Sequence, residues 1–331
     1  MTRAAKKIFS YLLKAAILVL AFVFIHHQYS EKGDNLRHFE TLISHISSNE
    51  AIFTMSAVGV LMLVNWLLES FKWQYVTRKI EKISALEAIE AVFCGLTWAI
   101  FTPNRLGEYA GRVLFLPNRK RIHGVFAMAV GSFGQNVITN VLGLSAVLWF
   151  LFTFYVNTGR HFQLNIWLYL LIAAGVIIFI VFFVILYFHI IWVVNILDRI
   201  PFIKKFHRFF DIMGRYKKPE LINIMLFCLA RFAVFTFQYY LIIHMLIPQM
   251  QAFEMIMMVL IFLFVQSALP SLDLVDIGVR NGMAVFLFGY ITHQTIAVMA
   301  AVSSIWLINL IIPAILGSLF VFNLKFFDRN S

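Results

Sequence analysis

Two short segments of the 331-residue chain carry charged residues at the same spacing after a proline. One segment follows Pro103 and the other follows Pro270, and in each the charged residues are separated by three and then four positions. Residues at these intervals lie on one face of an α-helix, about one turn apart. The residues concerned are Arg105, Glu108 and Arg112 in the first segment and Asp273, Asp276 and Arg280 in the second. Each segment therefore predicts a half-helix that begins beside a proline and presents carboxylates next to arginine.

This combination of groups is suited to binding an anion. The guanidinium fork can hold a phosphate with two hydrogen bonds, and the first turn of a helix adds unpaired N–H groups. We expect the arginines to bind the anion and the carboxylates to position them or to titrate. Two alternatives remain open. The pairs Glu108–Arg112 and Asp276–Arg280 could only neutralise one another, or Arg105 and Arg112 could lie at the cytoplasmic interface as topology signals.

The composition places these segments in a membrane protein. Hydrophobic residues make up 61% of the chain and charged residues 13%, whereas soluble proteins are about 45–50% apolar. The net charge of +11 could suggest a nucleic-acid ligand. However, the Lys and Arg residues lie between apolar runs, where they act as topology signals, so nucleic-acid binding is disfavoured.

Six apolar stretches are long enough to cross a membrane, which requires about 20 residues in a helix. The predicted spans are residues 8–29, 51–68, 122–159, 161–197, 221–247 and 296–323. Groups of Lys and Arg flank them, and one group combines Lys72 with Arg78, Lys79 and Lys82. By the positive-inside rule these groups lie in the cytoplasm, which places both termini there as well.

Two further apolar segments begin and end on the same side of the membrane in this topology. Residues 85–101 and 106–117 form one predicted hairpin, broken at Pro103, and residues 254–292 form the other, broken at Pro270. The fold class that follows is all-α: a polytopic membrane protein with six full spans and two oppositely oriented re-entrant helical hairpins. Such an arrangement is typical of an inverted repeat. We expect a single transmembrane domain, residues 1–331, with halves of about 1–158 and 159–331.

Several other polar residues occur inside the apolar runs. Arg231 lies about ten residues into its span, which indicates either a function or a buried partner. Asn136 is a candidate ligand-binding residue, although close helix packing is the preferred explanation for it and its neighbours Gln135 and Asn140. Gln266 and Ser267 could lie beside the second break as neutral hydrogen-bonding groups or could only join two helices. The remaining pair, Glu87 and Glu90, begins the first hairpin and is expected at the interface.

The two motifs resemble a known family. Pro-Asn-Arg-Leu-Gly-Glu-Tyr-Ala-Gly-Arg at 103–112 is similar to the first signature of the lysylphosphatidylglycerol synthase transmembrane-region family, and Pro-Ser-Leu-Asp-Leu-Val-Asp-Ile-Gly-Val-Arg at 270–280 is similar to its second. The resemblance implies a flippase-like domain of the bacterial cytoplasmic (inner) membrane. In the bifunctional members this domain moves aminoacylated phosphatidylglycerol outward and precedes a cytoplasmic aminoacyl-transferase domain. The chain ends shortly after its last span, so we do not expect an enzyme. Asp276 stands where the family pattern has Glu, which puts the identity of the lipid in doubt.

The sequence thus predicts translocation of a lipid or lipid-linked anionic substrate, with an anionic phospholipid as the preferred ligand. The site residues that we expect to bind it are Arg105, Glu108, Arg112, Asp273, Asp276, Arg280, Arg231 and Asn136. Neither a cofactor nor a metal is expected. Alternatives are an ion-coupled carrier of a small soluble anion, an intramembrane lipid-modifying enzyme that uses Asp273 and Asp276, and a non-transporting partner of another enzyme. A second copy of the chain and a separate lipid-synthesising enzyme remain open as protein partners.

Overall fold

The computed structural model describes residues 47–100, 102, 105–157, 164–204, 207–268 and 277–320, and every regular element in these ranges is helical. The first part of the chain contributes α3 (Ser48–Thr77), α4 (Ala85–Ala99), α5 (Leu106–Val113), α6 (Arg121–Phe150) and a π-helical end to α6 (Leu151–Asn157). The middle contributes α7 (Ile166–Phe188), α8 (Ile190–Asp198), α9 (Pro201–Lys204), α10 (His207–Gly214) and α11 (Lys218–Leu246). The last part contributes α12 (Ala252–Ala268), α13 (Ile277–Phe288), α14 (Thr295–Trp306), a π-helical turn (Leu307–Ile311) and α15 (Ile312–Phe320).

Five helical stretches of the described residues are long and apolar enough to cross a membrane. They are Asn49–Thr77, Asn118–Asn157, Ile166–Phe188, Lys218–Leu246 and Thr295–Phe320. These stretches coincide with five of the six predicted spans, and the span predicted at residues 8–29 lies outside the described residues. The most apolar of the five, α7, has none of its apolar window buried inside the protein. Such a surface is stable in lipid and not in water.

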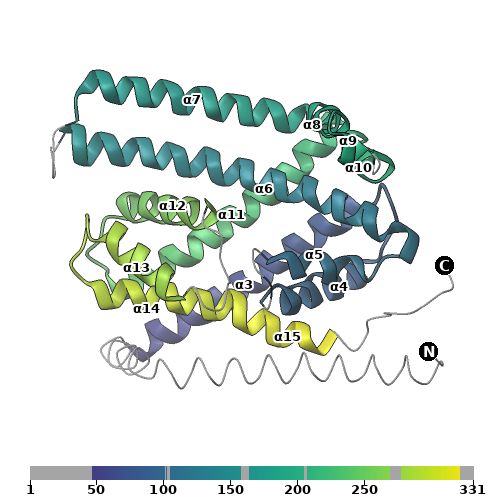
Figure 1. Ribbon diagram of the computed structural model, residues 1–331. Helices are drawn as coiled ribbons and strands as arrows, with labels where there is room; N and C mark the ends of the chain where they lie inside the picture. Colours follow the sequence, from purple (N-terminus) through teal and green to yellow (C-terminus); the bar gives the residue numbers. More distant parts are fainter. Residues whose placement is uncertain are drawn as a thin grey trace.

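The long helices form a bundle in which the two shorter helical pairs lie toward opposite ends. In Figure 1, α6 and α7 run side by side, α11 passes beneath them, and α3 with α14 and α15 forms the other side. The pair α4–α5 lies toward the end that carries α8–α10, whereas α12 and α13 lie toward the other end. The sequence predicted helices at 85–101 and 106–117, and the structure confirms a helical pair there.

The second arm of the pair α4–α5 is shorter than the predicted 106–117, because α5 ends at Val113. Arg121, at the beginning of α6, explains this end. Its Nε donates to the Leu116 carbonyl at 3.1 Å and its Nη2 to the Leu114 carbonyl at 3.3 Å. Carbonyl groups at a helix end need such partners, and this guanidinium supplies them.

The beginning of α4 is fixed by a capping box. The Ser84 hydroxyl accepts from the Glu87 backbone N–H at 3.1 Å, and the Glu87 carboxylate accepts from the Ser84 backbone N–H at 2.7 Å. This reciprocal pairing satisfies two N–H groups that a helix start otherwise leaves unpaired. Glu87 therefore has a local structural role at an exposed position, in agreement with its expected place at the interface.

Glycines let α4 approach both α5 and α15 backbone to backbone. A Cβ added to Gly111 would lie 2.6 Å from the Gly95 Cα, and a Cβ added to Gly95 would lie 2.9 Å from the Glu108 carbonyl oxygen. On the other side of α4, a Cβ at Gly317 would collide with the Phe93 carbonyl, and the Thr97 hydroxyl donates to the Ala314 carbonyl at 2.9 Å. These contacts fix the position of the α4–α5 pair between α3 and α15.

Substitution of Gly111 by alanine should lower the free energy of unfolding by about 1–3 kcal/mol, because the new methyl group has no space and α4 must move away from α5. Thermal unfolding of the purified variant in detergent measures this loss of stability. Gly175→Ala on α7 is the matched control, because nothing lies within 4 Å of the added Cβ. Equal melting temperatures for the two variants would show that the close approach is unimportant for stability.

One part of the predicted topology is wrong. The sequence grouped Lys72 with the cytoplasmic basic residues that follow the second span, but α3 continues to Thr77 and Lys72 is buried. Its ammonium group lies 2.7 Å from the Glu69 carboxylate on the same helix. The run of uncharged residues that defined the span ended at position 68, whereas the helix accommodates charged residues beyond that point because they are paired.

Candidate functional site

A cluster of six charged side chains lies among the apolar helices, and five of them come from the interior of α3, α5 and α11. We call this set the charge cluster, and its members are Glu69, Lys72, Arg105, Glu108, Arg112 and Arg231. Charged groups in an apolar environment are stable only when they are paired. Among the described residues the cluster contains four basic and two acidic groups, and the formal charge of these six is +2.

Glu69 is the carboxylate that joins the three helices. Its Oε1 accepts from Arg112 Nη1 of α5 at 2.5 Å, and its Oε2 accepts from Arg231 of α11 and lies 2.7 Å from Lys72 Nζ. Three cations thus share one carboxylate, which has only 5% of its surface exposed. Because its partners belong to α3, α5 and α11, Glu69 stabilises both the helix packing and the position of the arginines.

Arg112 is the most deeply buried cation of the charge cluster, with 1% of its side chain exposed. Its guanidinium is bound on one side by Glu69 and on the other by Glu108, one turn earlier on α5. Its Nε is buried and has no hydrogen-bond partner among the residues that the structure describes. The predicted pairing of Glu108 with Arg112 is therefore confirmed, and the second carboxylate, Glu69, comes from a different helix.

Arg105 and Arg231 are the more accessible cations of the charge cluster. Arg105 is 38% exposed and Arg231 is 17% exposed. The Arg105 Nε donates to the Glu108 carboxylate at 3.0 Å, so the three charged residues of the first motif are in contact although Arg105 precedes α5 and is not on its face. An anion that approaches the cluster from its surface would meet these two guanidinium groups before Arg112.

The backbone at Arg105 is unusual, because its φ of 57° lies in the left-handed region. Residues with a side chain seldom adopt this conformation, and it costs about 1 kcal/mol or more. Arg105 directly precedes α5, so this left-handed residue stands at the beginning of the second helix of the pair. It also directs the guanidinium onto Glu108.

Arg231 has the buried partners that its depth in the span indicated. In addition to Glu69, its Nε donates to the Asn65 side-chain oxygen at 3.0 Å, and its guanidinium carbon lies 5.3 Å from the centre of the Trp66 ring. Both residues belong to α3. An aromatic face and an amide oxygen thus hold Arg231 against α3 while part of its guanidinium edge remains accessible.

The second motif is described only from Ile277 onward, so Asp273 and Asp276 lie outside the described residues. Arg280 lies on α13, and the Gln266 amide of α12, with its oxygen toward the guanidinium, accepts from Arg280 Nε and Nη2 at 3.2 Å each. This contact joins α12 to α13 and fits both explanations of Gln266, as a neutral hydrogen-bonding group beside the second break or as a link between two helices. Asn281, the next residue on α13, bonds Ser303 of α14 at 3.1 Å.

The structure does not join Asn136 to the charge cluster. Its side chain is exposed on α6, and its carbonyl oxygen accepts from the Asn140 side chain at 2.7 Å. The nearby glycines act in helix packing, as predicted: a Cβ at Gly134 would lie 3.1 Å from the Tyr187 hydroxyl. Among the described contacts, none connects Asn136 to the site residues of α5 or α11.

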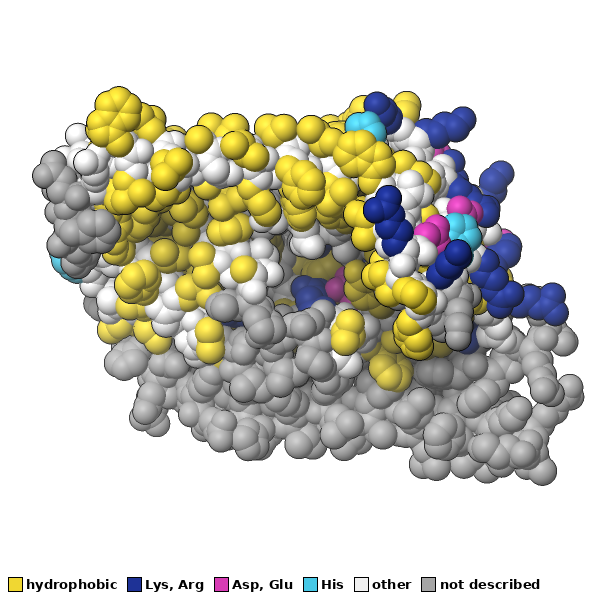
Figure 2. All heavy atoms as spheres, turned by 45° about the horizontal axis from the view of Figure 1, so that its top comes forward, with side chains coloured by type: hydrophobic (Ala, Val, Ile, Leu, Met, Phe, Trp, Pro, Cys, Tyr) yellow, Lys and Arg dark blue, Asp and Glu magenta, His cyan; other side chains and the backbone are white. Residues whose placement is uncertain are grey.

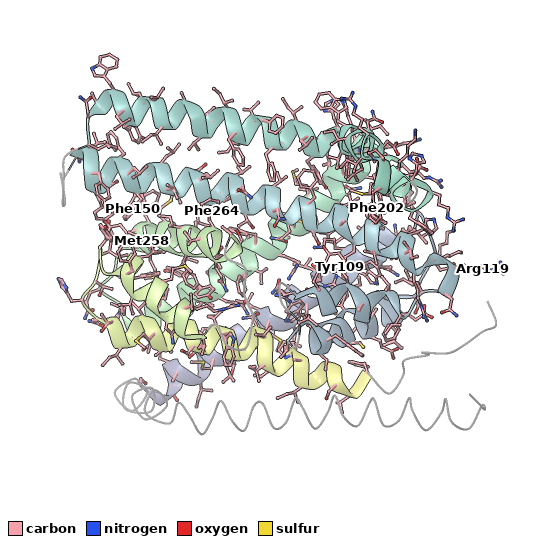
Figure 3. The ribbon with its side chains drawn as sticks, viewed as in Figure 1. Tyr109, Arg119, Phe150, Phe202, Met258 and Phe264 are labelled. Carbon is pink, nitrogen blue, oxygen red and sulfur yellow. The ribbon has the colours of Figure 1, made fainter. Side chains whose placement is uncertain are left out.

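The space-filling view shows how the polar interior meets the surface. In Figure 2 a recess opens in the middle of a largely hydrophobic face, and acidic and basic side chains are visible at its floor. Tyr109, labelled in Figure 3, is a neighbour of the charge cluster on α5, and its hydroxyl donates to Ser132 of α6 at 2.8 Å. The chemistry of the site is that of a net-positive, partly accessible group of arginines in an apolar protein.

Glu69 and Lys72 are the residues of this site that sequence reasoning missed, and Glu69 is the more important of them because it joins three helices. It directly follows the apolar run 51–68 and precedes Lys72 by three residues, so it resembled the polar end of a span. The available signal was the sequence that follows, because Ser-Phe-Lys-Trp-Gln-Tyr-Val-Thr at 70–77 remains rich in apolar and aromatic residues. A helix that continues through such a sequence places Glu69 and Lys72 inside the apolar layer.

Comparison with known families gives one match. A family model described as "Lysylphosphatidylglycerol synthase TM region" matches residues 11–317, which include every described helix from α3 to α14 and most of α15. No curated protein and no solved structure matches the chain.

Proposed function

This chain belongs to the lysylphosphatidylglycerol synthase TM region family, and from that premise we propose that it moves a lipid or lipid-linked anionic substrate across the bacterial cytoplasmic membrane. The family is related to lipid flippase-like transport, which gives the class of function. The charge cluster gives the chemistry of binding. The substrate that we propose is an anionic phospholipid or another lipid with a phosphate in its headgroup, and its transport needs no reaction on the lipid.

The observation that supports this proposal best is the group of four cations around two carboxylates in the described part of the chain. Each charge at the centre of a bilayer costs about 2.5–3.5 kcal/mol on insertion scales. Two of these cations, Arg105 and Arg231, keep part of their side chains exposed although they lie among apolar helices. Guanidinium groups bind phosphate with two hydrogen bonds, so an anionic headgroup is a suitable ligand for them.

The exposures of the side chains suggest how the headgroup would bind. The phosphate would first contact Arg105 and Arg231, in competition with Glu108 and Glu69. Arg112 would remain bound to the carboxylates of Glu69 and Glu108 and would hold these two side chains in place. The acyl chains would stay in the bilayer beyond the recess, which opens on an apolar face. The apolar face around the recess favours a lipid substrate over a small soluble anion.

We further propose that movement of the two halves, about 1–158 and 159–331, exposes the site to each leaflet in turn. In this mechanism α4–α5 and α12–α13 are re-entrant hairpins of opposite orientation, and both termini are cytoplasmic. Asp273, Asp276 and Arg280 would form the second contact for the headgroup. Gln266 of α12 lies against the Arg280 guanidinium and would keep it in position for the headgroup.

The direct test is lipid redistribution in proteoliposomes. A fluorescent phosphatidylglycerol placed in both leaflets is reduced from outside by dithionite, and the fraction reduced rises when lipid crosses the membrane. We expect faster and more complete reduction with the protein than in empty vesicles of the same composition. Rates equal to those of empty vesicles, for phosphatidylglycerol and for other anionic lipids, would refute the proposal. Uptake of phosphate or another water-soluble anion without lipid movement would favour the carrier instead, and a modified lipid product would favour the enzyme.

The accessible cations should control the rate of redistribution. Replacement of both Arg105 and Arg231 by glutamine should slow it by about ten-fold or more, because each hydrogen bond to a charged group is worth about 1.5–3 kcal/mol. Arg119→Gln is the matched control, since Arg119 is exposed at the end of the bundle (Figure 3). If the double variant transports lipid at the rate of the control, the cluster is not the binding site.

A further inference from the structure

The segment α8–α10 joins the ends of α7 and α11 and is distinct from the charge cluster. Helix α8 begins directly after α7, separated from it only by His189. One side of the segment packs into the bundle through residues that are buried: Ile190, Val194, Phe210, Ile212 and Met213. Figure 2 shows dark blue Lys and Arg side chains gathered at the end of the molecule that carries this segment.

The other side of the segment exposes large apolar side chains. Trp192 is 48% exposed and Phe202 is 75% exposed, and Ile191, Ile196 and Ile200 are exposed beside them. On α8, the positions 192, 196 and 199 are separated by four and three residues, and therefore lie on one face of the helix. Aromatic and aliphatic side chains in such number are unfavourable in water, but they are typical of helices that lie in a membrane interface.

Basic side chains are exposed in the same segment. Arg199, Lys204 and Arg208 are exposed, and each lies within a few residues of the exposed apolar groups. The two acidic residues of α8 and α10 are already engaged. Asp198 is bound by the His207 ring at 2.7 Å, and Asp211 accepts from Arg215 at 2.9 and 3.0 Å. The exposed surface of the segment thus combines apolar groups with an excess of positive charge.

We infer that α8–α10 is a binding surface for anionic phospholipids of the leaflet at this end of the bundle. The apolar side chains enter the boundary between headgroups and acyl chains, while Arg199, Lys204 and Arg208 contact the headgroup phosphates. Net negative lipids are preferred over zwitterionic ones, because several basic residues near an anionic surface attract it together. The inference rests on the exposure and charge of this segment, and it stands whether or not the proposed translocation is correct.

Trp192 allows a direct measurement, because it lies in the proposed surface and its fluorescence is quenched by brominated acyl chains in contact with it. Trp167, at the opposite end of α7 and 76% exposed, is a matched reference within the same protein. The full chain is reconstituted into bilayers that contain brominated phosphatidylglycerol or brominated phosphatidylcholine at equal mole fraction. The fluorescence of each tryptophan is obtained as a difference. It is the emission of the unchanged protein minus that of the Trp192→Phe or the Trp167→Phe variant.

We expect brominated phosphatidylglycerol to quench Trp192 roughly two-fold more than brominated phosphatidylcholine does, and to quench Trp167 equally with both lipids. High salt should remove the preference, because it screens the charges. The variant with Arg199, Lys204 and Arg208 all replaced by glutamine should also lose it, at an unchanged melting temperature.

Either of two results would overturn the inference. The first is equal quenching of Trp192 by both lipids in the unchanged protein. The second is a preference that persists in the triple variant. Weak quenching of Trp192 by both lipids would show that something other than the bilayer, such as a protein partner, covers the surface, and this too would exclude the lipid site.

Discussion

Replacement of Arg112 by alanine should lower the free energy of unfolding by about 3–5 kcal/mol and abolish lipid redistribution. The side chain is almost completely buried between Glu69 and Glu108. Its removal leaves Glu69 with Lys72 and Arg231 and Glu108 with Arg105. The two carboxylates nevertheless lose the buried guanidinium that joins them, and loss of one partner of a buried ion pair is strongly destabilising. Unfolding of the purified protein in detergent and lipid redistribution in proteoliposomes measure the two effects.

Two further substitutions separate the loss of charge from a general effect of mutation. Arg112→Lys keeps the positive charge but not the two-sided guanidinium fork, so its stability should lie between those of the unchanged protein and Arg112→Ala. Arg119→Ala removes an exposed arginine near the same hairpin and should change stability by less than about 0.5 kcal/mol. A loss of less than 1 kcal/mol in Arg112→Ala would show that water or another cation compensates the carboxylates, which would contradict the description of a closed ion pair network.

Replacement of Glu69 by glutamine should destabilise the protein by about 3 kcal/mol or more. Three cations on three helices share this carboxylate. The substitution preserves the shape of the side chain but removes its charge, so the formal charge of the charge cluster rises from +2 to +3. The exposed pair Glu81–Lys120 supplies the control, because Glu81→Gln alters the same functional group at a surface where ion pairs contribute about 0–1 kcal/mol.

A double-mutant cycle distinguishes charge imbalance from simple loss of packing. Adding Lys72→Met to Glu69→Gln returns the formal charge to +2, and the double variant should recover at least about 1 kcal/mol relative to the sum of the single effects. Denaturant or thermal unfolding of the four proteins gives the coupling energy. Additive effects, with no coupling between the two positions, would show that Glu69 and Lys72 do not depend on each other despite their separation of 2.7 Å.

The sequence predicted the local parts of this site and missed the parts that depend on tertiary structure. The spacing of Glu108 and Arg112 was sufficient to predict that they share a face of α5, because helical pitch determines it. Arg105 precedes α5 with a left-handed backbone, and its contact with Glu108 does not follow from helical pitch. The partner of Arg231 could not be predicted in this way. Glu69 is 162 positions from Arg231, and only the packing of α3 against α11 brings the two together.

The fold could be predicted to a similar extent. Apolar runs predicted five long helices among the described residues because helix length and hydrophobicity are local properties. The wrong assignment of Lys72 arose from the assumption that a charged residue marks the end of a span. Glu69, three residues earlier on the same helix, pairs with Lys72 and removes that requirement. No pattern within α3 reveals that Glu69 also binds Arg112 of α5 and Arg231 of α11.

The π-helical turn at Leu307–Ile311 gives the last long helix a property that its apolar composition does not indicate. A π-turn bonds residues five apart rather than four, so it adds a residue to the backbone without breaking the helix. This turn therefore determines which face of α15 points toward α4. Gly317 of α15 meets the Phe93 backbone of α4, and α4 in turn carries α5 through Gly95 and Gly111. The extra residue in this turn of the last helix therefore orients Gly317 toward α4. Because α4 packs against α5, the same turn affects the position of Arg112 on α5.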